Sequence, residues 1–323
     1  MNRLLIIMYH AIVQRPLAVS DWCFFDERSL RRNLQELTRY FEVTSLEEGI
    51  SRLSRGEICQ PTVAITFDDG FQNNHDVAFP VLLESRIPAT IFPVTGLVGT
   101  SDTLWFCRLN KAIAGTKLTS FEWNGRTYDL SSNACREASS AKLQEHLKFI
   151  PHPEALTVLR RIICELGDDP YEHIDADSPY RMLSRRSIED MTKSGLIEFG
   201  AHTHSHAILR LLPLDRQRSE ISKSVAHITE WTGRHCRLFA YPNGRLTDFD
   251  HRTVALARAW HFCGRHGCDG IQRCKNLGNG TATMWYRHEW GHLQDQAFLL
   301  STRTVPGQPQ TLAQLAPLNW LAV

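Results

Sequence analysis

The chain has 323 residues, of which 42% are hydrophobic, so it can bury a large core in one barrel-sized domain or in two smaller ones. Its 36 lysine and arginine residues nearly balance 35 aspartate and glutamate residues, and the formal net charge of +1 argues against nucleic acid or an anionic membrane as the main partner. Nine cysteines, an odd number dispersed over a long chain, fit reduced thiols better than a disulfide framework.

The chain opens on an apolar run, residues 4–9, that is too short to span a membrane and lacks the features of a secretory signal. We interpret it as the first strand and expect a cytoplasmic protein without stable membrane insertion. Asp26 is placed to cap a helix, and Ser45 with Glu48 forms a capping box for another. The segments 62–67 and 89–94 then predict buried strands with a helix between them. This alternation predicts parallel strands with helices outside.

The alternation stops over residues 101–179. This segment contains helical patterns at 141–150 and 153–166 and a predicted hairpin with an Asn-Gly turn at 121–128. We predict an insertion on one barrel loop, which is either a substrate-binding cover or a packed accessory subdomain. The alternation resumes with a helix at 184–194, a strand at 196–201, a helix at 215–232, a strand at 237–241 and a helix at 248–259. The whole chain, 1–323, therefore reads as one α/β domain of about seven βα units with an inserted subdomain.

Two adjacent carboxylates, Asp68 and Asp69, end the strand predicted at 62–67, where they would repel each other unless a cation or a proton resolved the conflict. The strand at 196–201 leads into His202 and His206, whose spacing places two imidazoles on one face of a helical turn. Two imidazoles and one carboxylate form a facial set that leaves coordination positions open, as in hydrolytic rather than structural zinc sites. We therefore predict a divalent metal, with zinc as the expected ion.

Other polar residues also follow predicted strands, where the functional groups of parallel α/β barrels gather. Asn243 follows the strand at 237–241, and His10 follows the first strand, where it either lines the pocket or makes a structural hydrogen bond. Each motif is weak alone, because Asp-Asp-Gly is commonly a solvated turn and a single His-x-x-x-His pair is unspecific. The site hypothesis depends on their joint occurrence at strand ends.

Three segments resemble the leading motifs of the polysaccharide deacetylase family, also called carbohydrate esterase family four. They are residues 66–70 (Thr-Phe-Asp-Asp-Gly), 202–206 (His-Thr-His-Ser-His) and 239–244 (Phe-Ala-Tyr-Pro-Asn-Gly). The early Met-Tyr-His at 8–10 is also similar to the opening of many members. The resemblance covers most of the chain outside the insertion, and it implies a distorted (β/α)7-type barrel.

The resemblance implies metal-dependent removal of acetyl groups from an N-acetylated, or O-acetylated, sugar or polysaccharide intermediate. Carried over by position, Asp69, His202 and His206 are the metal ligands, and Asp68 is the general base that accepts a proton from a metal-activated water.

The third motif implies a donor for the oxyanion that forms on the acetyl group. Within this turn Pro242 has no N–H, so the backbone N–H of Asn243 is the candidate. Tyr241, in the same turn, and His10 are the residues expected to line the substrate-binding site.

The chain departs from the family pattern at two positions. Many members have an arginine at the start of the third motif that holds the catalytic aspartate, and Ala240 stands there in this chain. Arg287 is the candidate replacement, with a surface salt bridge as the alternative reading. For the late histidine that protonates the leaving amine, His288 is preferred over His292 because it continues a strand-like segment.

Two other functions stay open on the sequence alone. The same metal set would suit hydrolysis of a non-sugar amide or cyclic imide, and the missing arginine would also fit a catalytically silent carbohydrate-binding protein. The expected partner of the deacetylase is an acetylated carbohydrate, and the sequence does not indicate an oligomeric state.

Overall fold

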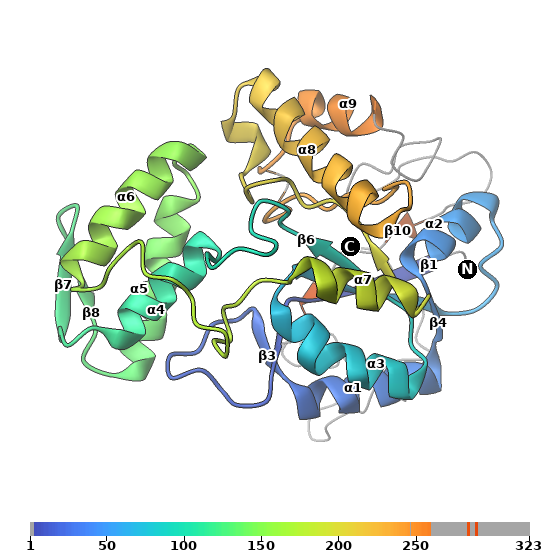
Figure 1. Cartoon of the computed structure of the whole chain (residues 1–323), viewed down its shortest axis with the longest axis horizontal. Coiled ribbons are helices and arrows are strands. Elements are labelled where there is room, and N and C mark those ends of the chain that lie inside the picture. The colour runs from blue at the N-terminus through green and yellow to red at the C-terminus, as the bar shows by residue number, and fades with distance from the viewer. Residues whose placement is uncertain (1–2, 246, 260–282, 285–287, 290–323) are drawn as a thin grey trace, which may run out of the picture.

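A parallel sheet organises the protein, with helices packed against it (Figure 1). The computed structural model describes residues 3–245, 247–259, 283–284 and 288–289. The strands of this sheet are β1 (Arg3–Tyr9), β4 (Glu42–Thr44), β5 (Thr62–Asp69), β6 (Ala89–Pro93), β9 (Ile197–Phe199), β10 (Thr283–Met284) and β11 (His288–Glu289).

The strand order is β10-β1-β5-β6-β9, with β11 also paired to β1 and β4 also paired to β5. A single parallel bridge from Ala201 to Phe239 extends the sheet beyond β9. Leu4 of β1 and Leu238, which lies beyond β9 on the other side of the sheet, belong to the same buried cluster, so the sheet curves around that cluster. The predicted α/β class with a parallel sheet is confirmed, and among the residues that the structure describes the curved sheet does not close into a complete barrel.

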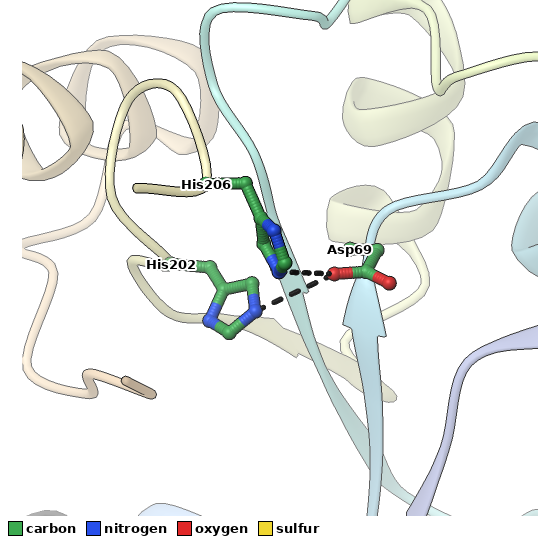
Figure 2. A group of neighbouring side chains, drawn as sticks. All are labelled: Asp69, His202 and His206. Atoms are coloured by element: carbon green, nitrogen blue, oxygen red, sulfur yellow. Dashed lines mark ion pairs between the residues drawn. The ribbon is translucent and has the colours of Figure 1, made fainter. Parts of the chain in front are cut away.

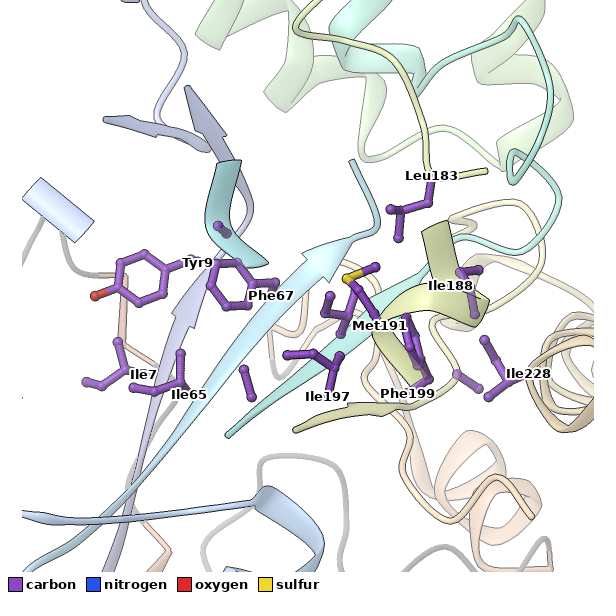
Figure 3. Packing of buried hydrophobic residues seen from close by; sticks show 14 of the residues in the cluster. Ile7, Tyr9, Ile65, Phe67, Leu183, Ile188, Met191, Ile197, Phe199 and Ile228 are labelled. Carbon is purple, nitrogen blue, oxygen red and sulfur yellow. The ribbon is translucent and has the colours of Figure 1, made fainter. Parts of the chain in front are cut away.

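Both faces of the sheet are apolar. Successive side chains of a strand point to opposite sides, and apolar residues are buried on each side. In β1, Ile7 and Tyr9 join the main core cluster, whereas Leu4 and Ile6 join the smaller one. Figure 3 shows the main core, where β1, β5 and β9 pack against helices. The helices of this part of the protein are α1 (Glu27–Tyr40), α2 (Leu46–Arg55), α3 (Phe79–Ser85), α7 (Arg185–Lys193), α8 (Leu214–Thr232) and α9 (His251–Ala259), with a π-helical turn η1 (Asn74–Ala78) and a 3-10 turn η2 (Leu209–Leu211).

Residues of the predicted insertion form a second cluster of buried side chains. The helices and the hairpin of the insertion lie to one side of the sheet in Figure 1. The predicted hairpin is present, and both turn residues, Asn124 (φ 50°) and Gly125 (φ 70°), are left-handed, as this turn type requires. The elements of the insertion are α4 (Trp105–Gly115), β7 (Ser120–Trp123), β8 (Arg126–Asp129), α5 (Asn133–Leu147) and α6 (His152–Glu165).

Three of the predicted helix starts have a side-chain cap and match the prediction, whereas α5, capped by Ser132, begins at Asn133 and not near residue 141 as predicted. Asp26 and Ser45 accept hydrogen bonds from the backbone of α1 and α2, and Ser184 does so for α7. Helix α4 and the short parallel pair β2 (Ala11–Val13) and β3 (Phe24–Asp26) were not predicted. The strand expected at 237–241 is reduced to the single bridge at Phe239. None of the described helices is both long enough and apolar enough to cross a lipid bilayer.

Candidate metal centre

Polar side chains from separate parts of the chain meet at the carboxyl edge of the sheet. Asp68 and Asp69 end β5, His10 directly follows β1, and the segment 202–206 follows β9. Because these strands are parallel, their carboxyl ends lie at the same edge, as the sequence analysis expected.

Asp69, His202 and His206 converge on one point (Figure 2). The Oδ1 atom of Asp69 lies 3.2 Å from Nε2 of His206 and 3.5 Å from Nε2 of His202. One ligand atom from each residue can be chosen so that all three lie within 4.8 Å of one another. The predicted ligand set is therefore brought together in space.

The three side chains suit a divalent cation. Both carboxylate oxygens of Asp69 are buried, and neither accepts a hydrogen bond from the described part of the chain. A buried carboxylate without such donors is unfavourable unless positive charge compensates it. Two imidazole nitrogens and one carboxylate oxygen are ligands that zinc prefers, and three protein ligands leave a coordination position open.

The orientation of His202 is fixed by the third motif. Its Nδ1 lies 2.8 Å from the backbone carbonyl oxygen of Ala240, so Nδ1 carries the proton and donates it to that carbonyl. The Nε2 atom then keeps its lone pair and faces Asp69. In metal sites, a hydrogen bond from the ring nitrogen that does not bind the metal holds a ligand histidine in the tautomer that does bind it.

The charge states of the cluster agree with cation binding. Burial acts to raise the pKa of Asp69, but the imidazoles of His206 and His202 more than offset it, and the pKa lies below its usual range. Burial lowers the pKa of His206, although Asp69 acts in the opposite direction. An ionised carboxylate beside a neutral imidazole is the state in which both groups can coordinate a cation.

The segment 202–206 is an irregular loop and not the helical turn that the histidine spacing predicted, so that part of the prediction is wrong. The two imidazoles converge because Thr203 (φ 63°) and His206 (φ 61°) adopt the left-handed conformation and bend the backbone. Glu220 of α8 holds this bend: its carboxylate accepts the N–H groups of His204 and Ser205 at 2.9 and 2.8 Å. It also accepts the Ser205 hydroxyl at 2.9 Å.

Asp68 and His10 flank the cluster. The Asp68 side chain is buried, with Oδ2 3.9 Å from Nε2 of His202. The Nε2 atom of His10 is 4.0 Å from Oδ2 of Asp69, and the His10 ring meets the edge of the half-exposed Trp22 indole. Both residues are therefore close enough to the cluster to act on a molecule bound there.

The third motif reaches the same edge through Ala240. Asn243 follows in an exposed turn with φ 66°, and its expected role as a donor stays a prediction. The Tyr241 side chain, expected at the substrate-binding site, is only 2% exposed and stacks on Phe249 with ring centroids 4.5 Å apart. Its ring belongs to the main core, so the expectation that this side chain lines the substrate site is corrected.

The remaining predicted residues lie at or beyond the limits of the described chain. Arg287 and His292 fall outside the described residues. The backbone of His288 is described: it lies in β11, opposite Ile7 of β1. This strand leads towards the same region of the sheet as His10.

The sequence analysis missed Glu220, Ala240 as a carbonyl acceptor, and the exposed Trp22. The Glu220 carboxylate binds backbone N–H groups and Ala240 accepts through its backbone carbonyl, and backbone atoms carry no sequence signal. Trp22 sits between Asp21 and Cys23 in a segment without periodicity. Only the hydrogen bonds and ring contacts of the folded chain reveal these three residues.

Comparison with known proteins identifies a protein family that matches this chain. The family model described as polysaccharide deacetylase matches residues 55–146 and 168–262, which is more than half of the chain. A curated relative, the poly-beta-1,6-N-acetyl-D-glucosamine N-deacetylase of Staphylococcus epidermidis, is 24% identical over 165 residues. That match covers 51% of this chain and 55% of the relative, so the chain spans about half the length of the curated relative that it matches.

Solved structures show the same fold. IcaB from Ammonifex degensii matches with a TM-score of 0.51 and 20% identity, covering 80% of this chain and 81% of that one. The deacetylase PplD of Streptococcus pyogenes, solved in complex with acetate, matches with a TM-score of 0.50 and 18% identity, covering 80% of each chain. With the family match over both the Asp-Asp and the histidine motifs, the family suggested by the sequence is confirmed. This chain belongs to the polysaccharide deacetylase family.

Proposed function

We propose that the protein is a hydrolase that depends on a divalent cation, preferably zinc, and removes acetyl groups from N-acetylated sugar units of a polysaccharide. The observation that carries this proposal is the cluster of Asp69, His202 and His206, with Asp68 beside it, at the carboxyl edge of the sheet. Family membership supports the deacetylation chemistry. The name of the staphylococcal relative makes a polymer of N-acetylglucosamine the first substrate to test.

Asp68 is the proposed general base. When bound, the cation would polarise the acetyl carbonyl and make water a stronger acid. Asp68 is not needed to complete the three-ligand set, and its carboxylate is 4% exposed beside His202. It takes a proton from the attacking water as the water oxygen bonds to the acetyl carbon.

Asn243 and His288 have the other proposed roles. The backbone N–H of Asn243 donates to the carbonyl oxygen as negative charge develops there, and one such donor contributes about 3 kcal/mol. The carbon–nitrogen bond then breaks, and His288 gives the amine a proton, which leaves acetate and a free amino sugar. Arg287 is the proposed cation for Asp68 in place of the arginine that the third motif lacks.

The experiment measures acetate release and metal content on the same preparations. The zinc-loaded wild type should release acetate from β-1,6-linked or β-1,4-linked N-acetylglucosamine oligomers. Asp68→Asn should lose at least about a hundredfold in kcat and keep its zinc, because it removes the base and leaves the three ligands. His206→Ala should lose both activity and zinc.

His251→Ala is the matched control, since His251 is exposed on α9 away from the cluster. It should match the wild type in zinc content and activity. Full activity in Asp68→Asn would remove the proposed base. A wild type that hydrolyses small cyclic imides, and releases no acetate from any acetylated sugar, would refute the proposed function.

A further inference from the structure

An exposed tryptophan, Trp22, lies beside the candidate metal centre. It is 51% exposed, whereas the other tryptophans that the structure describes are largely covered by protein. Its indole contacts the imidazole of His10, with the ring centroids 4.9 Å apart. The Nε2 atom of His10 in turn lies 4.0 Å from Oδ2 of Asp69. A single imidazole therefore separates this indole from a predicted metal ligand.

The ring geometry leaves a face of the Trp22 indole accessible. The planes of the two rings are 82° apart, so the His10 imidazole does not lie flat on the indole and covers at most one of its faces. About half of the residue remains in contact with solvent. A flat aromatic surface next to a polar centre suits a ligand with one apolar side, such as the C–H groups of a sugar ring.

The residues on either side of Trp22 are buried and fix its direction. Asp21 and Cys23 are 8% and 2% exposed. The Oδ1 atom of Asp21 accepts hydrogen bonds from the backbone N–H and the thiol of Cys23, at 3.3 and 3.0 Å. The N–H of Phe24 donates to the carbonyl oxygen of Asp21 at 3.0 Å, which closes a turn with Trp22 at its second position. The exposure of the indole is therefore set by a hydrogen-bonded turn, residues 21–24.

The insertion holds this turn from the other side. The amide of Gln144, on α5, donates to Oδ2 of Asp21 at 3.1 Å. The amide of Asn110, on α4, donates to the backbone carbonyl of Val19 at 3.3 Å. All four of these residues are buried, so water does not compete for either hydrogen bond. The turn that carries Trp22 therefore keeps a defined position relative to the insertion.

We propose that Trp22 binds the sugar ring of the substrate at the candidate metal centre, and that the insertion positions Trp22 for this contact through Gln144. This inference rests on the proposed function, and it names the residue that recognises the sugar and not the acetyl group. The indole contacts the sugar equally before and during the reaction, so it contributes to binding and little to the chemical step. Gln144 is a positioning residue that acts through Asp21.

The test measures kcat, KM and zinc content of the zinc-loaded full chain with N-acetylglucosamine oligomers. Trp22→Ala should raise KM about tenfold and change kcat by less than about twofold, because it removes binding that is uniform along the reaction. Trp22→Phe keeps a smaller aromatic face and should stay within about threefold of the wild-type KM. Both variants should keep the wild-type zinc content, since neither replaces a predicted ligand. A side chain that served only to orient His10 would change kcat or zinc content instead.

Gln144→Ala tests the role of the insertion. It should raise KM about threefold, and it should have no further effect when combined with Trp22→Ala, because it acts through that side chain. Two controls remove exposed side chains elsewhere on the insertion or next to it. Tyr171 is 67% exposed and its ring lies under Arg160 of α6, and Lys142 is exposed on α5. Tyr171→Ala and Lys142→Ala should both keep the wild-type KM.

The possible failures are distinguishable. A KM for Trp22→Ala within about twofold of the wild type, or a loss confined to kcat or zinc content, would overturn Trp22 as the residue that binds the sugar. An equal effect of Gln144→Ala with and without Trp22→Ala would overturn the positioning role of the insertion. A wild type that releases no acetate from these oligomers would instead refute the proposed function.

Discussion

At the scale of single residues, the candidate site concentrates unfavourable backbone conformations. Asp69, Thr203, His206 and Asn243 all have φ between 61° and 71°, in the left-handed region that residues other than glycine seldom adopt. Each belongs to one of the three motifs. Such conformations persist only where the surrounding structure holds them, and at functional sites they set the direction of a side chain or a backbone group.

Gly70 completes the turn after Asp69, and its replacement should be severe. Its φ is 78°, and a Cβ atom added there would lie 2.5 Å from Cβ of Pro93. We predict that Gly70→Ala lowers the free energy of unfolding by about 3 kcal/mol, from left-handed strain plus overpacking. Gly125→Ala is the control, because Gly125 has φ 70° with open space around it, and it should cost about 1 kcal/mol. Equal losses in urea unfolding would show that contact with Pro93 is unimportant.

The three residues of the candidate metal centre could be predicted from the sequence, whereas their geometry could not. Asp69 and the two histidines follow apolar runs, and parallel strands bring such ends together, so their meeting was predictable. The helical turn expected for His202 and His206 is absent because left-handed residues bend the loop instead. The hydrogen bonds from His202 to Ala240 and from the loop to Glu220 join residues 38, 16 and 15 positions apart, and no local pattern marks them.

At the scale of elements, α8 holds the histidine loop through Glu220 and through Ser224, whose hydroxyl accepts the His202 N–H at 3.3 Å. The Glu220 carboxylate accepts two backbone N–H groups and the Ser205 hydroxyl. We predict that Glu220→Ala weakens zinc binding about 10- to 100-fold, because the loop loses the contacts that orient both ligand histidines. Glu230→Ala, on an exposed position of the same helix, should bind zinc as the wild type does. Competition with a chelator measures both, and equal affinities would contradict the role of Glu220.

An ion pair at the junction of β4 and α2 should make stability depend on pH. Arg52 donates to both oxygens of Glu42 at 2.7 and 2.8 Å, which lowers the pKa of Glu42 from 4.5 to about 2. A group whose folded pKa is lowered contributes stability above its unfolded pKa and loses it as the pH falls towards the folded value. The Glu42 and Arg52 side chains are 32% and 19% exposed, so we expect the pair to contribute about 1 kcal/mol to the free energy of unfolding.

The measurement for this pair is urea unfolding of the wild type and Glu42→Gln at several pH values. The difference in unfolding free energy should be full near neutral pH and should shrink as the pH falls from 4.5 towards 2. Glu36→Gln removes a carboxylate that pairs with Arg39 within α1, and it should change stability by less than about 0.5 kcal/mol. A pH-independent difference for Glu42→Gln would mean that the pair contributes nothing.

Elements with local signals were predictable, and elements that depend on tertiary contacts were not. The side-chain caps at Asp26, Ser45 and Ser184 mark helix starts in the sequence itself. Helix α4 begins after Leu104, which provides no side-chain cap, and most of its apolar residues are buried. The sequence therefore has no capping residue that would have marked the start of this helix within the largely polar segment.

At the scale of the whole molecule, the two largest clusters of buried residues belong to different parts of the chain. The sheet and its helices form one, and the insertion forms the other. Residues from the insertion line a cleft that also contains His206. The relation between these two parts therefore decides the shape of the cleft beside the candidate metal centre.

The pair of Glu145 and Arg245 is the connection between these two parts that charge reversal can test. It joins residues 100 positions apart, from α5 to the turn after the third motif. Glu145 and Arg245 are 43% and 47% exposed, so the pair should contribute at most about 1 kcal/mol. We predict that Glu145→Arg speeds hydrogen exchange in the last turn of α5 by up to about fivefold, because like charges then separate α5 from the turn.

The double variant Glu145→Arg with Arg245→Glu restores an attractive pair and should return exchange in α5 towards the wild-type rate. The control is Glu84→Arg, which breaks the pair between α3 and Arg31 of α1, both packed against the sheet. It places a like charge on a similarly exposed surface without touching the insertion, so exchange in α5 should stay unchanged. If Glu145→Arg also leaves α5 unchanged, other contacts such as that of Gln144 with Asp21 are sufficient to hold the insertion. The charged pair would then have no part in fixing the cleft beside the candidate metal centre.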